Sequence, residues 1–279
     1  MIGLATSSDF PELSGGEKLL HDALSKRGEC KIVVWDDPAE AWRECESIIV
    51  RCTWDYSYRV LEFWTWIDRV EAAGITLYNS PNVLRWNSDK RYLRDLEMRG
   101  VKVVETTWIP RAKMTVESMR ELVRGPSVIK PVISAGAYDT LRVSPENAEE
   151  VAASLLELNQ SKGFMLQPFV EEVQSPGEYS LIYFDKEFSH AVLKTPQAGD
   201  FRVQPRYGGE QGAAQVEAEI IAQGRKILDA VPYDDRLLYA RVDGVIRGGE
   251  FLLMELELIE PYLFLEFGKN AGAKLASLL

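Results

Sequence analysis

Charged side chains interrupt two apolar runs near the C-terminus at every second position. Arg241 and Asp243 lie in the first run, Glu255 and Glu257 lie in the second, and two glycines separate the runs. The pattern predicts a β-hairpin, and a three-residue loop over 247–249 would place all four side chains on one face. Crowded carboxylates repel one another unless cations hold them, and oxygen-only ligands suit Mg²⁺. A solvated strand face alternates in the same way, so the hairpin alone leaves both interpretations open.

Lys130 lies in an apolar strand that small residues follow. The stretch 128–131 reads Val-Ile-Lys-Pro, and a buried ammonium there requires an anion, either a phosphate oxygen or a neighbouring carboxylate. Ser134 and Gly136 belong to a loop of small side chains whose backbone N–H groups could approach phosphates. Small residues are also common in ordinary turns, so this loop is a weak signal by itself.

Three further stretches could contact a nucleotide. Lys90 is expected in the first turn of a helix, where the helix dipole favours an anion, although a solvated lysine is the alternative. Gln167–Val170 end an apolar strand, so their edge could bind adenine and Glu178 could bind the ribose, with a simple hinge as the alternative. Lys194 precedes a glycine-bearing loop, 197–212, that could close over phosphates and exclude water.

A second group of residues could recognise a small substrate. Arg51, Trp54, Asp55 and Tyr56 follow one another at the end of an expected parallel strand, where open α/β sheets bind ligands. The arginine would bind a carboxylate, the aspartate an ammonium, and the aromatic rings would form walls; a cluster at a domain interface is the alternative. Arg202 is a further candidate, because the guanidinium fork matches phosphate and carboxylate oxygens.

Composition excludes several classes of function. The chain has 279 residues, 46% of them hydrophobic, and a net charge of −11, which argues against a nucleic-acid scaffold. We expect no signal peptide and no membrane partner, because the N-terminus lacks a basic region and no apolar run approaches about 18 residues. Three scattered cysteines favour a reduced cytoplasm, and two distant histidines exclude a zinc site or a Ser-His triad. A homodimer is one oligomeric state that the sequence allows.

Two types of organisation follow each other along the chain. Strands expected at 2–5, 31–35, 47–52 and 76–78 alternate with helices at 16–26, 39–45 and 61–73, which predicts a parallel α/β sheet. No G-x-G-x-x-G follows the first strand, so a dinucleotide site is unsupported. From residue 88 onward a helix to 99, a strand at 101–105 and later antiparallel strands predict an α+β region. We therefore expect α/β plus α+β domains at 1–86, 87–170 and 171–279.

The order of these candidates resembles the ATP-grasp superfamily of carboxylate–amine ligases over residues 87–265. The segments 51–56, 192–196, 199–204 and 255–261 look more narrowly like its glutathione-synthetase-like subgroup. The resemblance implies an ATP-grasp fold with an N-terminal pre-ATP-grasp α/β domain. Most of the superfamily has Asn as the third metal ligand where this chain has Glu257, and a carboxylate can also bind Mg²⁺.

The resemblance also implies roles for the residues of the site. ATP phosphates would contact Lys90, Lys130 and the loop with Ser134 and Gly136, and Arg241 would steady the acyl phosphate together with Lys130 and Arg202. The remaining roles are adenine binding by Gln167, Phe169 and Val170, ribose binding by Glu178, a phosphate or base contact by Lys194, Mg²⁺ binding by Asp243, Glu255 and Glu257, and acceptor contact by Glu260 and Tyr262.

The implied reaction transfers the γ-phosphoryl group of ATP to a carboxylate, after which an amine attacks the acyl phosphate. The substrate would be a small amino acid or peptide, and the sequence leaves joining of two substrates and cyclisation of one open. An ATP-binding regulator without ligase activity and a kinase that phosphorylates a hydroxyl are the alternatives. The intact acidic cluster and both lysines argue against the regulator.

Overall fold

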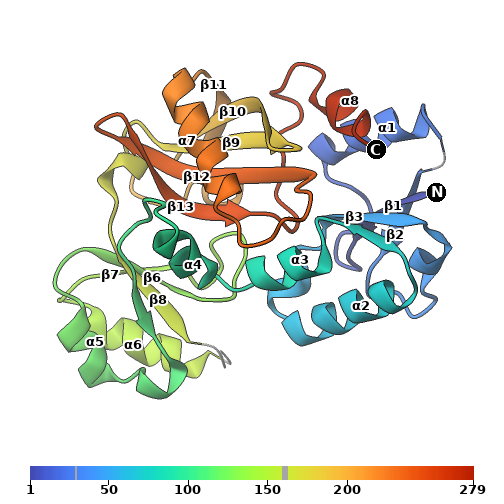
Figure 1. Cartoon of the computed structure of the whole chain (residues 1–279). Helices are drawn as coiled ribbons and strands as arrows, with labels where there is room; N and C mark the ends of the chain where they lie inside the picture. Colours follow the sequence, from blue (N-terminus) through green and yellow to red (C-terminus); the bar gives the residue numbers. More distant parts are fainter. Residues whose placement is uncertain (29, 159–162) are drawn as a thin grey trace.

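Three β-sheets organise the chain, as Figure 1 shows for the computed structural model. The structure describes residues 1–28, 30–158 and 163–279. The sheets have the strand orders β2-β1-β3-β4, β5-β8-β6-β7 and β11-β10-β9-β12-β13. The first sheet is parallel, and the other two are antiparallel. This confirms the predicted combination of α/β and α+β regions.

The N-terminal region contains the parallel sheet and the helices that cover it. Its elements are β1 (Ile2–Thr6), α1 (Gly15–Ser25), β2 (Cys30–Val34), β3 (Ser47–Cys52), α2 (Val60–Ala72), β4 (Thr76–Tyr78) and α3 (Pro81–Asn87). Helix α2 buries Phe63, Trp66, Ile67 and Val70, which lie on one stripe at helical spacing. Gly74 ends this helix region with a positive φ of 73°.

The central region is a small sheet with helices packed on one side. Its elements are β5 (Thr107–Ile109), α5 (Val116–Leu122), β6 (Ser127–Pro131), β7 (Leu141–Val143), α6 (Ala148–Glu157) and β8 (Phe164–Pro168). Thr115 and Ser118 form a capping box at the start of α5. Figure 1 shows α5 and α6 together below these strands.

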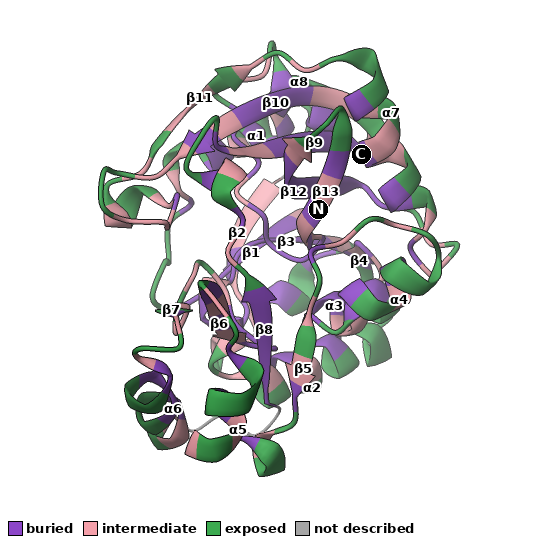
Figure 2. Cartoon of the chain, turned by 90° about the vertical axis from the view of Figure 1, so that its left-hand side faces the viewer, coloured by how far each residue is buried: buried purple, intermediate pink, exposed green. Residues whose placement is uncertain are grey.

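The C-terminal region is built on the five-stranded sheet. Its elements are β9 (Glu178–Phe184), β10 (Glu187–Thr195), β11 (Glu210–Ala214), α7 (Ala218–Asp229), β12 (Tyr239–Arg247), β13 (Glu250–Glu257) and α8 (Ala271–Ala276). Helix α8 returns to the N-terminal region and packs beside α1 (Figure 1). Figure 2 shows that the central strands of this sheet are largely buried.

The expected helix over 88–99 is wrong in its boundaries. The chain forms α3, then a break at 88–91, and then α4 (Tyr92–Met98). Ser80 accepts a hydrogen bond from the Val83 amide and Pro81 is the first helical residue, so a Ser-Pro start signal was overlooked. The break places Lys90 before α4 rather than in its first turn.

The expected strand at 101–105 is also wrong. In this segment Val103 makes only an isolated parallel bridge to Leu253, and the Val104 amide donates to the Leu253 carbonyl. The predicted domain boundaries at 86/87 and 170/171 stay predictions. Among the described residues, no helix is both long and apolar enough to cross a membrane.

Candidate active site

A cavity of about 810 Å³ lies where the three regions meet. Its volume is within the range of small-molecule sites, which is about 300–1,000 Å³. The cavity brings together nineteen of the twenty predicted site residues: Trp54, Asp55, Tyr56, Lys90, Lys130, Ser134, Gly136, Gln167, Phe169, Val170, Glu178, Lys194, Arg202, Arg241, Asp243, Glu255, Glu257, Glu260 and Tyr262. Arg51 is the exception.

The C-terminal hairpin presents its charged residues to this cavity, although its loop differs from the prediction. The loop has two residues, Gly248 and Gly249, both with positive φ, instead of three. A β-bulge adds Met254 on β13, so Asp243 pairs with Glu255 while Gly244 pairs with Leu253. The extra residue on β13 compensates for the shorter loop, so that Glu255 and Glu257 still lie opposite Asp243 and Arg241. The four charged side chains therefore line the same cavity, as predicted.

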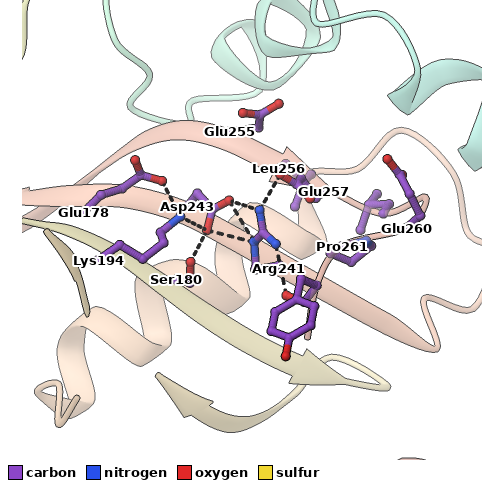
Figure 3. Close-up of polar contacts among 12 residues, drawn as sticks. Glu178, Ser180, Lys194, Arg241, Asp243, Glu255, Leu256, Glu257, Glu260 and Pro261 are labelled. Atoms are coloured by element: carbon purple, nitrogen blue, oxygen red, sulfur yellow. Dashed lines mark hydrogen bonds and ion pairs between the residues drawn. The ribbon is translucent and has the colours of Figure 1, made fainter. Parts of the chain in front are cut away.

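Protein cations hold the acidic side chains of the hairpin. Arg241 donates to Asp243, with an Nε–Oδ2 distance of 2.9 Å, and its Nη2 contacts Glu257. Lys194 lies 2.6 Å from Glu178 and 3.3 Å from Asp243, as the dashed lines of Figure 3 show. Arg241 is shared by Asp243 and Glu257, and Lys194 is shared by Glu178 and Asp243. The described residues contain no group of three or more acidic, His or Cys side chains arranged to hold a metal. The predicted Mg²⁺ site at Asp243, Glu255 and Glu257 stays a prediction.

Glu255 is held by lysines from other regions. Its Oε1 lies 2.5 Å from Lys90 Nζ, which also donates to the Ser134 carbonyl at 2.8 Å. Burial by itself would raise the pKa of Glu255, but Lys90 and Lys130 outweigh burial and hold that pKa at about 2. Burial has the larger effect on Glu257 and raises its pKa to about 7 despite Arg241. Glu255 is therefore the more firmly ionised of the two.

Lys130 has a different environment from the other lysines of the cavity. Its side chain forms no ion pair or hydrogen bond within the part of the chain that the structure describes. Burial lowers its pKa, because the ammonium loses solvation there. Of the two alternatives open from the sequence, a direct carboxylate partner is absent among the described residues. An anionic ligand would remove this cost.

The expected adenine segment and the glycine-bearing loop also face the cavity. Gln167 donates to Thr106 at 2.9 Å, and the Phe169 amide donates to Pro126, so this amide is already occupied. Arg202 lies over the Tyr207 ring at 3.7 Å and forms an ion pair with Asp200 at 2.7 Å. The guanidinium of Arg202 therefore has a protein partner in this arrangement, and its predicted contact with phosphate or substrate stays a prediction.

Arg51 lies behind the cavity wall, so its position does not support the prediction that it binds substrate. Its side chain is fully buried and makes two hydrogen bonds of 2.7 Å to Glu17. It also donates to the Pro261 carbonyl and lies over the Tyr239 ring. The alternative interpretation, a cluster at the interface of two regions, describes Arg51 correctly.

Replacing Arg51 with Met is expected to lower the free energy of unfolding by about 3–5 kcal/mol, because Glu17 would remain as an unpaired buried charge. Urea denaturation measures this loss. The double variant Arg51→Met/Glu17→Leu should recover more than half of it. Arg85, which pairs with Asp68 and Glu71 at the surface, is the matched control, and Arg85→Met should change stability by less than about 1 kcal/mol. A loss at Arg51 as small as the control's would contradict the assignment.

Sequence reasoning missed several residues of the cavity wall. Asp9 and Phe10 follow β1, and Asn87 and Tyr92 flank the break between α3 and α4. The rule that ligands bind at the carboxyl ends of parallel strands could have identified Asp9 and Phe10. No comparable signal existed for Tyr92, whose hydroxyl accepts a hydrogen bond from the Leu256 amide at 2.9 Å.

Comparison with known proteins gives matches over nearly the whole chain. Residues 2–79 match the family model described as D-cycloserine synthetase DcsG, N-terminal domain. Residues 95–261 match that of prokaryotic glutathione synthetase, ATP-grasp domain. The chain is 30% identical to the cycloserine biosynthesis protein DcsG of Streptomyces lavendulae, over 88% of this chain and 86% of that protein. A glutathione synthetase of Ralstonia nicotianae is 24% identical over 77% and 64% of the two chains.

Solved structures agree with these matches. The crystal structure of D-cycloserine synthetase DcsG has a TM-score of 0.88 and 27% identity, and the match covers 99% of this chain and 97% of that one. A D-alanine–D-alanine ligase from Bacillus anthracis, complexed with ATP, has a TM-score of 0.71 and 14% identity over 99% and 94% of the chains. This second likeness concerns the fold alone.

Proposed function

Since the chain belongs to the prokaryotic glutathione synthetase family of ATP-grasp ligases, we propose that it activates the carboxylate of a small amino-acid-like substrate as an acyl phosphate and joins it to an amine. The family forms C–N bonds with ATP, and this chain is accordingly an ATP-dependent carboxylate–amine ligase. The observation that carries the proposal is the meeting of unpaired Lys130 with the acidic face of the hairpin in one cavity.

The lysines of the cavity would bind the phosphates of ATP. The side chain of Lys130 has no protein partner among the described residues. Lys90 lines the same cavity and donates to the Ser134 carbonyl and to Glu255. The loop with Ser134 and Gly136 lines the cavity beside them. Positive charge at these positions would stabilise the negative charge that develops during phosphoryl transfer. Arg241 would hold the acyl-phosphate oxygens from the opposite wall.

The acidic residues of the hairpin fit a magnesium site. Asp243, Glu255 and Glu257 offer only oxygen ligands from adjacent strands, which is the donor set that Mg²⁺ prefers. Lys90, Lys194 and Arg241 hold them as ion pairs, so binding would require these contacts to rearrange. Bound Mg²⁺ would neutralise phosphate charge. The three cations hold the carboxylates at the cavity, and they lower the pKa values of Asp243 and Glu255.

The relatives favour an amino-acid-like substrate and a cyclic product. The match to D-cycloserine synthetase covers both the N-terminal region and the ATP-grasp region, and the segments 51–56 and 255–261 resemble the D-cycloserine-forming O-ureido-D-serine cyclo-ligase. We therefore propose intramolecular C–N bond formation as one form of the reaction. Because the reaction consumes ATP, we place it in the cytoplasm.

Phosphate release from ATP tests the proposal with a panel of D- and L-amino acids, their O-substituted derivatives and dipeptides. At least one class should stimulate release by about tenfold or more. ADP and phosphate should form in equal amounts, together with a product that has lost one water. Mass spectrometry then distinguishes cyclisation from joining. Retained ATP binding without stimulation by any compound would indicate a regulator, and ADP without free phosphate would indicate a kinase.

A further inference from the structure

Glu260 is a buried carboxylate of the cavity that forms no ion pair with any of the described residues. The acidic side chains on the neighbouring strands, namely Glu178, Asp243, Glu255 and Glu257, all pair with lysine or arginine. Glu260 is only 6% exposed and lines the same cavity, yet it forms no ion pair or hydrogen bond with another side chain of the described residues. Figure 3 shows its carboxylate pointing away from the ion-pair cluster. Ionisation of such a group is costly unless a cation, for example one on a ligand, pairs with it.

The backbone around Glu260 is held in place from several sides. Four successive carbonyls accept hydrogen bonds from side chains: Leu258 from Asn79 at 2.8 Å, Ile259 from the Tyr239 hydroxyl at 2.7 Å, Glu260 from Trp54 at 3.3 Å, and Pro261 from Arg51. Because these contacts fix the segment, it cannot easily turn to expose the carboxylate to water. The fold therefore fixes the Glu260 carboxylate so that it faces the cavity.

The surroundings of Glu260 favour a positive charge in front of it. Burial, with a further contribution from Glu257, raises the pKa of Glu260 to about 8, so ionisation is costly without a ligand. Trp54, Tyr56 and Tyr262 line the same cavity and supply aromatic surface, which also attracts cations. Lys130, which lines the same cavity, is a cation that has no ion pair among the described residues. The cavity thus contains an acidic and a basic side chain that have no ion pair among the described residues.

We propose that Glu260 binds a protonated amino group of the substrate. This inference rests on the proposed ligase function and assigns the substrate class: a compound with a free ammonium as well as the carboxylate that is activated. An ammonium paired with a carboxylate keeps its proton and is not a nucleophile. The amino group at Glu260 is therefore retained in the product, and a different nitrogen attacks the acyl phosphate.

The test compares substrates with and without the amino group. The probes are the amino acids of the panel and their des-amino counterparts, for example serine against 3-hydroxypropionate. The wild-type enzyme should prefer the amino compound by about 100-fold in kcat/KM. Glu260→Gln should lose about tenfold or more of this preference through a higher KM for the amino compound, with the KM for ATP changed by less than about threefold. Glu260→Asp, which keeps the charge, should retain part of the preference.

Controls separate this inference from the function and from the fold. Glu250→Gln, at the exposed start of β13, the strand that precedes Glu260, should leave the preference unchanged. Glu260→Gln should raise the melting temperature of the free protein, because the wild-type carboxyl must stay protonated in the folded state at neutral pH, a cost that glutamine does not have. A preference within about twofold of the wild type, or a lower melting temperature, would overturn the assignment. If no panel compound stimulates the wild-type enzyme, the ligase proposal itself fails.

Discussion

Glu255→Gln is expected to reduce turnover by about 100-fold or more while the fold stays intact. The substitution keeps the size of the side chain but removes the charge that we assign to magnesium binding and that holds Lys90 at 2.5 Å. Steady-state phosphate release with the best panel substrate measures the loss, and circular dichroism checks the fold.

The same variant has a predicted pH dependence of stability. The pKa of Glu255 is lowered to about 2 from 4.5, so its ion pair stabilises the folded state above about pH 4.5 and this contribution disappears as the pH falls towards 2. The stability difference between wild type and Glu255→Gln should therefore shrink over that range. Glu250→Gln is the control on the same strand. Turnover of Glu255→Gln within a few-fold of the wild type would contradict the metal assignment.

Lys130→Met is expected to have opposite effects on activity and stability. Methionine fills a similar volume without charge, so ATP binding should weaken by at least about tenfold and turnover should fall by about 100-fold. The free protein should become more stable, with a melting temperature higher by about 2 °C or more, because a partly buried ammonium without an ion pair among the described residues is removed. Calorimetric titration with ATP and thermal unfolding measure the two effects.

The sign of the pH dependence distinguishes this explanation from a general packing effect. Partial burial lowers the pKa of Lys130, so its charge is costly at neutral pH and the cost disappears as the pH rises towards 10.5. The stability gain of Lys130→Met should shrink over the same range. Lys113→Met, at an exposed position, should change neither ATP binding nor the melting temperature. Loss of stability together with loss of activity would show that Lys130 has a structural partner.

Local patterns were sufficient to predict most of the residues that line the cavity. Period-two placement of Arg241, Asp243, Glu255 and Glu257 predicted a shared face, and the bulge at Met254 preserved that face although the loop was shorter than expected. Lys130 was found because a charged residue inside an apolar strand violates the pattern of its element. Amphipathic spacing also placed α2 correctly, because one helical stripe must be buried.

Orientation within the tertiary structure could not be inferred from these patterns. Arg51 follows an apolar run in β3, where both sheet faces are buried, so nothing in its spacing told whether it points to the cavity or to Glu17. The break between α3 and α4 depended on a Ser-Pro start that competed with a second capping signal at residues 87–89. Cavity residues such as Tyr92 carried no signal at all.

The order of residue types along the chain was enough to predict the ATP-grasp family, the parallel and antiparallel regions, and which side chains line the cavity, because these depend on periodicity and local chemistry. The pairing of charges was decided only by packing. Lys90, Lys194 and Arg241 come together in one cavity and form ion pairs with the acidic residues of the hairpin, while the side chains of Lys130 and Glu260 form no ion pair among the described residues. Charge pairing depends on distances of a few ångströms between segments far apart in sequence, and such distances exist only in the folded chain.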